Sequence, residues 1–215
     1  MIKLSASLIR DYMDCPQRAM YRIENPEQSV STIPMEAGSV VHKIIEEDLA
    51  FYEPLLEQFE DKERKKIYRC ISNYERLFKN LTSKNDKIEY HFNYNLYKDV
   101  FMSGKIDRII ANDTVLDWKS SYQTPESIDD DVQFIIYYDT YKRLFGREPK
   151  ALLYIGLYTG KVVTYHPKEK YIYELYNRVI PEMVKSIKHR HFMRQGIFKG
   201  ICESCSFKDY CLREM

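Results

Sequence analysis

Residues 100–119 read VFMSGKIDRIIANDTVLDWK and contain two β-strand patterns that carry charged side chains in their second halves. Apolar residues dominate Val100–Ile110 and Thr114–Lys119, and Ala111-Asn112-Asp113 between them predicts a turn. Residues two apart on a strand point to the same side of a sheet, so Asp117 and Lys119 are expected to project together. These two strands predict where the chemistry of the chain is concentrated.

Asp107 lies between apolar residues on the first of these strands. An acid in such a position is costly unless a cation or hydrogen bonds compensate its charge. Neighbouring strands are about 4.8 Å apart, so Asp107 and Asp117 could bring two carboxylates together, a donor set that suits Mg²⁺ or Mn²⁺. A two-residue turn at Asn112 and Asp113 would instead pair Asp107 with Trp118 and turn it to the wrong face. We therefore expect a three-residue connection or a bulge.

Lys119 could take part in the chemistry beside such a metal. Its ammonium group could orient the attacking water and offset the negative charge of the transition state, without acting as a base. Spacing alone leaves another interpretation open, in which Asp117 and Lys119 form a surface ion pair and Asp107 is an edge residue.

Hydrophobic periodicity predicts helices on both sides of this segment. Two short helices within Ser7–Ile23 should meet near Cys15, because Pro16 fits only the first turn of a helix, and the proline-containing stretch Asn25–Gly38 should be a loop. Further helices are expected over residues 39–60, 62–80, 129–146 and 169–194, a first strand over 88–96, and a final hairpin over 151–158 and 161–165. This order predicts one α/β domain over residues 1–215, with a central mixed sheet that contains an antiparallel meander and is flanked by helices.

Composition narrows the class of protein. With 215 residues, of which 44% are hydrophobic, the chain can bury one substantial core. No apolar run has the length of a membrane span or a signal peptide, so a cytoplasmic protein without a membrane partner is expected. The net charge of +1 does not by itself indicate a nucleic-acid partner. Basic residues gather in two stretches, each of which could be a solvated helix face: Lys62, Arg64, Lys65, Lys66 and Arg69, and Lys185, Lys188, His189, Arg190, His191, Arg194 and Lys199.

Three motifs together resemble the RecB-like branch of the PD-(D/E)XK nucleases: Gly104-x-x-Asp107, Asp117-x-Lys119 and Gln133-x-x-x-Tyr137. The resemblance implies a restriction-endonuclease-like core. It implies that Asp107 and Asp117 bind the catalytic metal with the Trp118 carbonyl and an upstream helical histidine. His42, in Gly38-Ser39-Val40-Val41-His42, matches that histidine, although a core histidine bonded to backbone is the alternative.

Gln133 and Tyr137 are four residues apart and so share one helical face. The resemblance implies that they line the catalytic cleft and help to position the substrate strand; without it, they would be an ordinary half-buried helix face. Glu46, one turn after His42, and Glu89, on the first strand, could steady a ligand, but each is more often structural.

Four of the five cysteines form the most specific pattern, with Cys202-x-x-Cys205-x-x-x-x-x-Cys211 near the end of the chain and Cys15 far upstream. In a reducing compartment clustered cysteines are better explained as metal ligands than as disulfides. Their spacing suits a [4Fe–4S] cluster or a tetrahedral Zn²⁺. Cys70 is expected to be a small buried hydrophobe outside this set.

The N-terminal Cys-Pro and the C-terminal cysteine triplet are similar to those of AddB-type nuclease domains and of free-standing CRISPR adaptation exonucleases, which implies an iron–sulfur cluster. Residues 1–24 and 195–215 would form the iron–sulfur subregion. Ligands from both ends close a loop of nearly the whole chain and remove unfolded-state freedom, so the cluster is expected to be a clasp and not an electron carrier.

The resemblance implies an Mg²⁺- or Mn²⁺-dependent deoxyribonuclease, an exonuclease on single-stranded or frayed DNA ends in recombination, repair or CRISPR adaptation, with a helicase or CRISPR integrase as a possible partner. Phosphate contacts are expected from Lys185, Lys188, Arg190 and Arg194. A noncatalytic DNA-end-binding subunit of a larger helicase–nuclease or integrase complex is the rival hypothesis. A zinc-stabilised adaptor for protein partners is a third.

Overall fold

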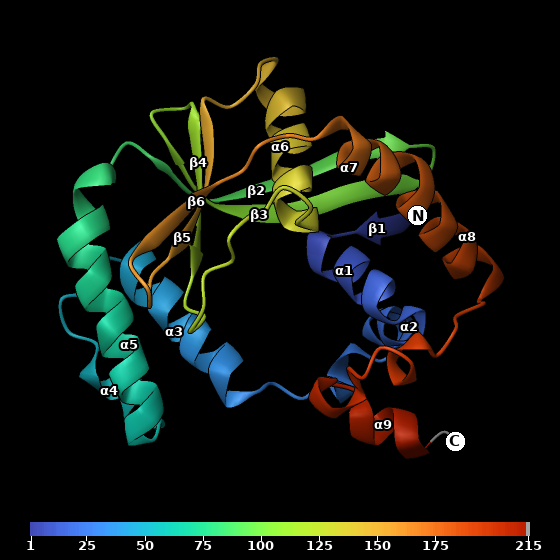
Figure 1. Ribbon diagram of the computed structural model, residues 1–215, viewed down its shortest axis with the longest axis horizontal. Coiled ribbons are helices and arrows are strands. Elements are labelled where there is room, and N and C mark those ends of the chain that lie inside the picture. Colours follow the sequence, from blue (N-terminus) through green and yellow to red (C-terminus); the bar gives the residue numbers. More distant parts are fainter. Residues whose placement is uncertain (214–215) are drawn as a thin grey trace. The chain divides into compact units, whose positions relative to one another are not determined.

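The computed structural model describes residues 1–213 and contains one mixed sheet with the strand order β1-β3-β4-β5-β6, in which β2 also pairs with β3 (Figure 1). β1 is parallel to β3 and β4 is parallel to β5, whereas β3 and β4, and β5 and β6, are antiparallel. The strands are β1 (Ile2–Leu4), β2 (Lys87–Tyr97), β3 (Val100–Ile110), β4 (Thr114–Lys119), β5 (Ala151–Gly156) and β6 (Lys161–Thr164). The predicted α/β class, with helices around a mixed sheet, is confirmed.

The chain forms two compact units. The first unit contains residues 1–31, 93–104 and the described residues from 168 onward, and the second contains residues 32–92 and 105–167. Strands β2 and β3 contribute residues to both units, because each of them crosses a boundary.

The second unit places helices on both faces of its strands. Trp118 of β4 lies under α5 (Asp61–Asn73) and the π-helical turn after it, where the ring of Tyr74 meets the indole edge to face at 5.6 Å. On the other face, Phe134 of α6 (Val132–Phe145) lies 6.2 Å from the ring of Tyr154 on β5. α3 (Ile33–Glu46) and the short α4 (Glu53–Leu56) complete the layer beside α5. The core of this unit therefore forms around β4 and fixes its orientation.

The first unit gathers the helices near both chain ends. α1 (Ala6–Asp14) is capped at its N-terminus by Ser5, whose hydroxyl accepts a 3.2 Å hydrogen bond from Leu8 N. Cys15 is extended between α1 and α2 (Pro16–Glu24), which confirms the predicted break. Tyr12 contacts Ser186 at 2.9 Å between hydroxyls. The remaining helices are α7 (Glu169–Glu174), α8 (Ile180–His189) and α9 (Lys208–Arg213).

Several predicted helix boundaries were wrong. α3 begins at Ile33 and not at Ser39, because Pro34 is tolerated in the first helical turn and does not extend the loop. α3 also ends at Glu46 and not near residue 60, since Asp48 adopts a left-handed conformation with φ 48°. The predicted helix 169–194 is divided by a π-helical turn at 175–179 and ends at His189, where Arg190 has φ 51°.

Two further differences concern short elements. β1 has three residues and was not predicted, because so short a stretch has no recognisable periodicity. Helix α5 ends at Asn73 and passes into a π-helical turn, so the predicted helix 62–80 is not continuous. Among residues 1–213, no helix combines the length and the apolar character needed to cross a membrane.

Candidate active site

The connection between β3 and β4 sets the position of two aspartates. Ile110 pairs with Thr114 across a three-residue connection, as predicted, and the same register extended along the strands brings Asp107 opposite Asp117. Asp107 Oδ2 accepts a 2.9 Å hydrogen bond from the backbone N–H of Trp118. The Asp107 carboxylate therefore turns towards β4.

Asp117 is completely buried and lies within a chain of polar contacts. Its Oδ2 lies 2.6 Å from Lys119 Nζ, and its Oδ1 accepts a 2.9 Å hydrogen bond from Gln133 Nε2. Gln133 Oε1 accepts a 3.0 Å hydrogen bond from Lys119 Nζ. One amide on α6 thus holds both the acid and the lysine of the Asp-x-Lys motif.

Tyr137 supports this arrangement from one helical turn further along α6. Its hydroxyl accepts a 2.7 Å hydrogen bond from Gln133 Nε2 and donates one of 2.6 Å to the carbonyl of Lys105. The tyrosine is only 3% exposed. Burial first, and then the charges of Asp117 and Asp107, raise the pKa of Tyr137 well above its usual value, so its hydroxyl stays protonated.

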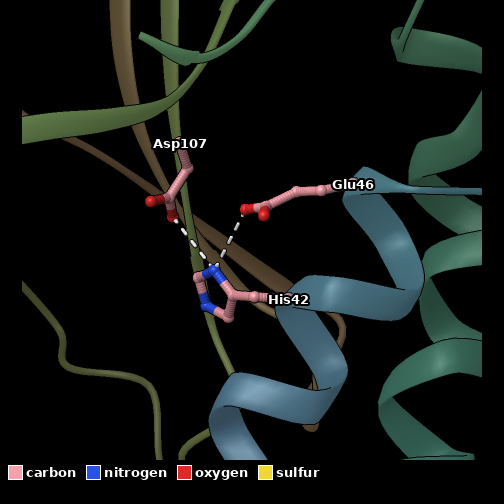
Figure 2. A group of neighbouring side chains, drawn as sticks. All are labelled: His42, Glu46 and Asp107. Carbon is pink, nitrogen blue, oxygen red and sulfur yellow. Dashed lines mark ion pairs between the residues drawn. The ribbon is translucent and has the colours of Figure 1, made fainter. Parts of the chain in front are cut away.

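His42 and Glu46 extend from α3 towards Asp107 (Figure 2). His42 Nδ1 lies 3.4 Å from Glu46 Oε1 and 3.7 Å from Asp107 Oδ2. One ligand atom from each of these three side chains lies within 4.8 Å of the others, as in a metal-binding group. The four-residue spacing of His42 and Glu46 places both on one face of the helix.

Glu89 and Lys105 adjoin this group. Lys105 forms an ion pair with Glu89, and Glu89 and Glu46 are close enough that each shifts the pKa of the other. Glu89 has φ 49°, an uncommon conformation for a residue other than glycine, and it interrupts the regular alternation of β2. The two glutamates that the sequence offered as auxiliary residues therefore lie next to each other.

Burial dominates the electrostatics of the acids. It is the main cause that raises the pKa of Asp117 to about 6, with Asp107 adding to the rise and Lys119 opposing it. Burial likewise raises the pKa of Asp107 and of Glu46. For His42, burial lowers the pKa, but the nearby Glu46, Asp107 and Asp117 together raise it above the usual value. These carboxylates thus lie where a further positive charge would be favourable.

The donor set fits a divalent cation. Imidazole nitrogen and carboxylate oxygen are ligands that Mn²⁺ accepts, and carboxylate oxygen suits Mg²⁺. Glu46 Oε1 and Asp117 Oδ2 are buried without a well-oriented hydrogen-bond donor, although Lys119 Nζ lies close to the latter. A metal would satisfy both oxygens.

The four cysteines of the predicted cluster all line one cavity of about 180 Å³ in the first unit, so Cys15 lies near the C-terminal triplet. Gly196 forms part of the wall: a Cβ at this position would lie 3.3 Å from Cys202 Sγ. Among the described residues no three of the thiols all lie within 4.8 Å of one another. Cys70 is fully buried in the core of the second unit, as expected.

The predicted phosphate-binding residues have different environments in the first unit. Lys188 is exposed, Lys185 lies 3.9 Å from Glu182, and Arg190 pairs with Glu24 at 2.8 Å. Arg194 lines the cysteine cavity. Lys185 and Arg190 therefore already have carboxylate partners.

Sequence reasoning undervalued Glu46. Its position one helical turn after His42 was the available signal, but the sequence does not reveal that the helix directs both side chains at Asp107. The distance between Asp107 and His42 in the chain makes this contact invisible to local patterns.

Comparisons with known proteins agree with this geometry. The family model described as the PD-(D/E)XK nuclease superfamily matches residues 3–212. A presumed exonuclease from Eubacterium rectale is similar in structure, with a TM-score of 0.67 and 17% identity over 89% of this chain and 84% of that one. The protein SSO0001 has a TM-score of 0.53 and 16% identity over 96% of this chain and 84% of that one. These identities show a shared fold only, and no curated protein matches the chain.

Nucleases of this superfamily usually use Mg²⁺ or Mn²⁺, in keeping with the buried acids around His42 and Lys119. The family match covers nearly the whole chain and includes every residue of the candidate site. The protein therefore belongs to the PD-(D/E)XK nuclease superfamily.

Proposed function

We propose that the protein is an Mg²⁺- or Mn²⁺-dependent deoxyribonuclease of the RecB-like type that acts as an exonuclease on single-stranded or frayed DNA ends. The observation that carries the proposal is the hydrogen-bonded group of Asp117, Lys119 and Gln133 beside Asp107 and His42. A noncatalytic DNA-end-binding protein has no need to keep a buried acid and a lysine in this arrangement.

His42, Asp107, Asp117 and the Trp118 carbonyl would hold the metal, and the structure adds Glu46 as a candidate ligand. A bound divalent cation supplies Lewis-acid polarisation of the scissile phosphate. His42, Glu46 and Asp107 need little rearrangement, because α3 and β3 already direct the imidazole and these two carboxylates at one another.

Lys119 would orient the attacking water and stabilise the negative charge that develops on the phosphate. Asp117 and Gln133 keep its ammonium group in place, which restricts a flexible side chain to one position. Hydrolysis then joins the water oxygen to phosphorus and breaks the bond to the leaving oxygen of the next nucleotide. Tyr137 acts indirectly in this scheme, because it positions Gln133.

The test is cleavage of end-labelled single-stranded DNA in Mn²⁺ by the wild type, Asp117→Ala and Lys119→Ala. We expect both variants to lose cleavage. The control is Asp48→Asn, which removes an exposed carboxylate from the same unit. Equal cleavage by all four proteins would remove the proposed site, and DNA binding by a wild type that cleaves nothing would support the noncatalytic alternative.

We also propose that Cys15, Cys202, Cys205 and Cys211 hold a [4Fe–4S] cluster that joins residues 1–24 to residues 195–215, of which 214–215 lie outside the described residues. Tetrahedral zinc with Zn–S bonds of about 2.3 Å needs sulfurs about 3.8 Å apart. The cavity of about 180 Å³ that the four thiols line favours a larger group. The cluster would stabilise the fold as a clasp.

Anaerobic purification tests this assignment. We expect brown protein that contains iron and acid-labile sulfide, and loss of both in Cys205→Ser. Colourless protein with one zinc and no iron would contradict the cluster and favour the zinc-stabilised adaptor.

Exposed Lys188, together with Lys185, Arg190 and Arg194, would contribute phosphate contacts near this subregion. DNA ends would be supplied by a helicase or CRISPR integrase partner in recombination, repair or CRISPR adaptation. Affinity purification of the protein from its own cells tests whether such a partner binds it. The phosphate contacts are tested by the salt dependence of DNA binding, which should be weaker in Lys185→Gln/Lys188→Gln than in the wild type.

A further inference from the structure

The second unit contains a basic groove that the candidate active site does not use. It encloses about 450 Å³ and is lined by Lys62, Lys65, Lys66, Arg69, Tyr122 and Tyr158. We call these six residues the α5 groove. Lys62 lies three and four residues before Lys65 and Lys66, and these lie four and three residues before Arg69, so one face of α5 carries all four cations.

Lys66 distinguishes the α5 groove from an ordinary solvated helix face. The residue is only 6% exposed, and within residues 1–213 no carboxylate forms an ion pair with it. Its Nζ lies 5.0 Å from the centre of the Tyr122 ring. The stem of Lys66 is therefore packed away from solvent while the residue lines the groove, where an anion would be a favourable partner for its ammonium group.

The two acids in the first turn of the same helix, Asp61 and Glu63, do not line the groove. Asp61 pairs with Arg64 at 3.0 Å, and neither of these residues lines the groove. Lys62, Lys65 and Arg69 are exposed and, like Lys66, have no ion-pair partner in the described part of the chain. Four positive charges therefore face one concave surface, and a polyanion is the ligand that suits it.

Two tyrosines of the groove favour a polyanion that also carries planar groups over a simple acidic chain. The rings of Tyr122 and Tyr158 meet edge to face at 4.8 Å, and the Arg69 guanidinium lies 4.6 Å from the centre of the Tyr158 ring. Arg69 Nε also donates a 2.9 Å hydrogen bond to the Tyr158 carbonyl, which fixes its position. Tyr122 remains 44% exposed, so it offers ring surface to a planar group. Aromatic rings beside cations are typical of surfaces that bind unpaired bases and their phosphates.

The α5 groove is joined to the catalytic strand by a short path. Tyr122 follows Lys119 by three residues, and the Lys119 carbonyl accepts a 2.9 Å hydrogen bond from Leu157 N. Asn73 of α5 donates hydrogen bonds of 2.7 and 3.1 Å to the carbonyls of Leu157 and Tyr158. The end of β4 therefore positions both Lys119 and the tyrosines of the groove.

We propose that the α5 groove binds single-stranded nucleic acid, with Lys62, Lys65, Lys66 and Arg69 on the phosphates and an unpaired base stacked on Tyr122. The proposal rests on the proposed nuclease function, since the strand in the groove is taken to be the one that reaches Lys119. A duplex would not satisfy Tyr122, because its internal bases expose no free ring face.

Fluorescence anisotropy with a labelled oligothymidylate tests the proposal in a chelator, where no cleavage occurs. Two groove variants are compared with the wild type: Lys62→Gln/Lys65→Gln and Tyr122→Leu, all at exposed positions. The matched control is Lys84→Gln/Lys150→Gln, which removes two exposed charges of the same unit outside the groove. An abasic oligonucleotide and labelled polyglutamate serve as further probes, and circular dichroism verifies folding.

We expect the groove charge variant to bind oligothymidylate about tenfold more weakly and to reduce the salt slope by about 1.4, at about 0.7 for each lost phosphate contact. Tyr122→Leu should lose about tenfold on oligothymidylate and nothing on the abasic strand. The control should bind like the wild type. Wild-type affinity in both groove variants would overturn the proposal, as would equal losses by Tyr122→Leu on both strands. The proposal would also be overturned if Lys62→Gln/Lys65→Gln lost binding to polyglutamate but not to oligothymidylate. That result would favour an acidic protein partner.

Cleavage in Mn²⁺, measured in parallel, separates this proposal from the nuclease function. If the wild type cleaves DNA but the groove variants bind like the control, only the groove assignment fails. If the groove variants lose binding as expected but the wild type cleaves nothing, the groove stands and the catalytic function fails.

Discussion

Gln133 donates a 2.9 Å hydrogen bond from Nε2 to Oδ1 of Asp117, while its Oε1 accepts from Lys119 Nζ. The amide thereby fixes the relative positions of the two groups that the reaction requires. Replacement with methionine keeps the length of the side chain but removes both hydrogen bonds. We expect Gln133→Met to reduce kcat about 10- to 100-fold, an effect typical of residues that orient a ligand, while Mn²⁺ still binds. Steady-state cleavage assays measure the change, and Gln123→Met, at an exposed position, should behave like the wild type.

Asp117 should destabilise the metal-free protein at neutral pH. Its pKa is raised to about 6, mainly by burial, so the folded state binds this proton more tightly than the unfolded chain. Stability is therefore lost as the pH rises from about 4 through 6. Asp117→Asn removes the charge, and in a chelator we expect it to gain about 1–3 kcal/mol over the wild type above pH 6 and little near pH 4.

Thermal unfolding at several pH values measures this difference. The groups that face Asp117 are Lys119, Asp107 and His42, and they are unchanged in the variant. Asp48→Asn, on the surface, should show no such pH-dependent gain. A variant that is less stable than the wild type by the same amount at every pH would contradict the electrostatic account.

Cys70 should resist alkylation under native conditions. The thiol is fully buried, and burial raises its pKa to about 11, so little thiolate forms at pH 8. The other four cysteines are half-buried. In cluster-free protein, iodoacetamide should modify those four and leave Cys70 intact until a denaturant is added. Peptide mapping by mass spectrometry follows each site, and rapid native labelling of Cys70 would disprove its core position.

Gly156 pairs with Lys119 across β4 and β5 and has no room for a side chain. A Cβ there would lie 2.2 Å from Thr124 Oγ1 and 2.7 Å from Thr159 Oγ1. We expect Gly156→Ala to lower stability by about 1–3 kcal/mol and to reduce cleavage, because the segment after Lys119 must shift. Adding Thr124→Ala should restore part of both losses. Denaturant unfolding and cleavage rates provide the measurements. If Gly156→Ala had the stability and cleavage rate of the wild type, the two threonines would not be packed tightly against this position.

The sequence predicted the features that depend on local pattern. Alternation and parity were sufficient for β3, β4 and the three-residue connection, and hence for the meeting of Asp107 with Asp117. The break at Cys15 followed from Pro16. Pro34 misled the prediction, since the same residue can end a loop or begin a helix, and only tertiary packing of α3 decides between them.

Contacts between distant segments could not be predicted from pattern. The approach of Glu46 to Asp107 depends on how α3 packs on the sheet, and the α5 groove depends on Tyr122 and Tyr158 arriving from two loops. Lys66 looked like one charge among several on an exposed helix face. Its burial against Tyr122 became visible only in three dimensions.

An Mn²⁺ titration followed by electron paramagnetic resonance tests directly whether β3, β4 and α3 hold a divalent metal. We expect the wild type to bind Mn²⁺, and Asp107→Asn and Asp117→Asn each to weaken binding at least tenfold, while Asp48→Asn should not. Mn²⁺ binding of the same affinity in all four proteins would contradict a metal held between β3, β4 and α3.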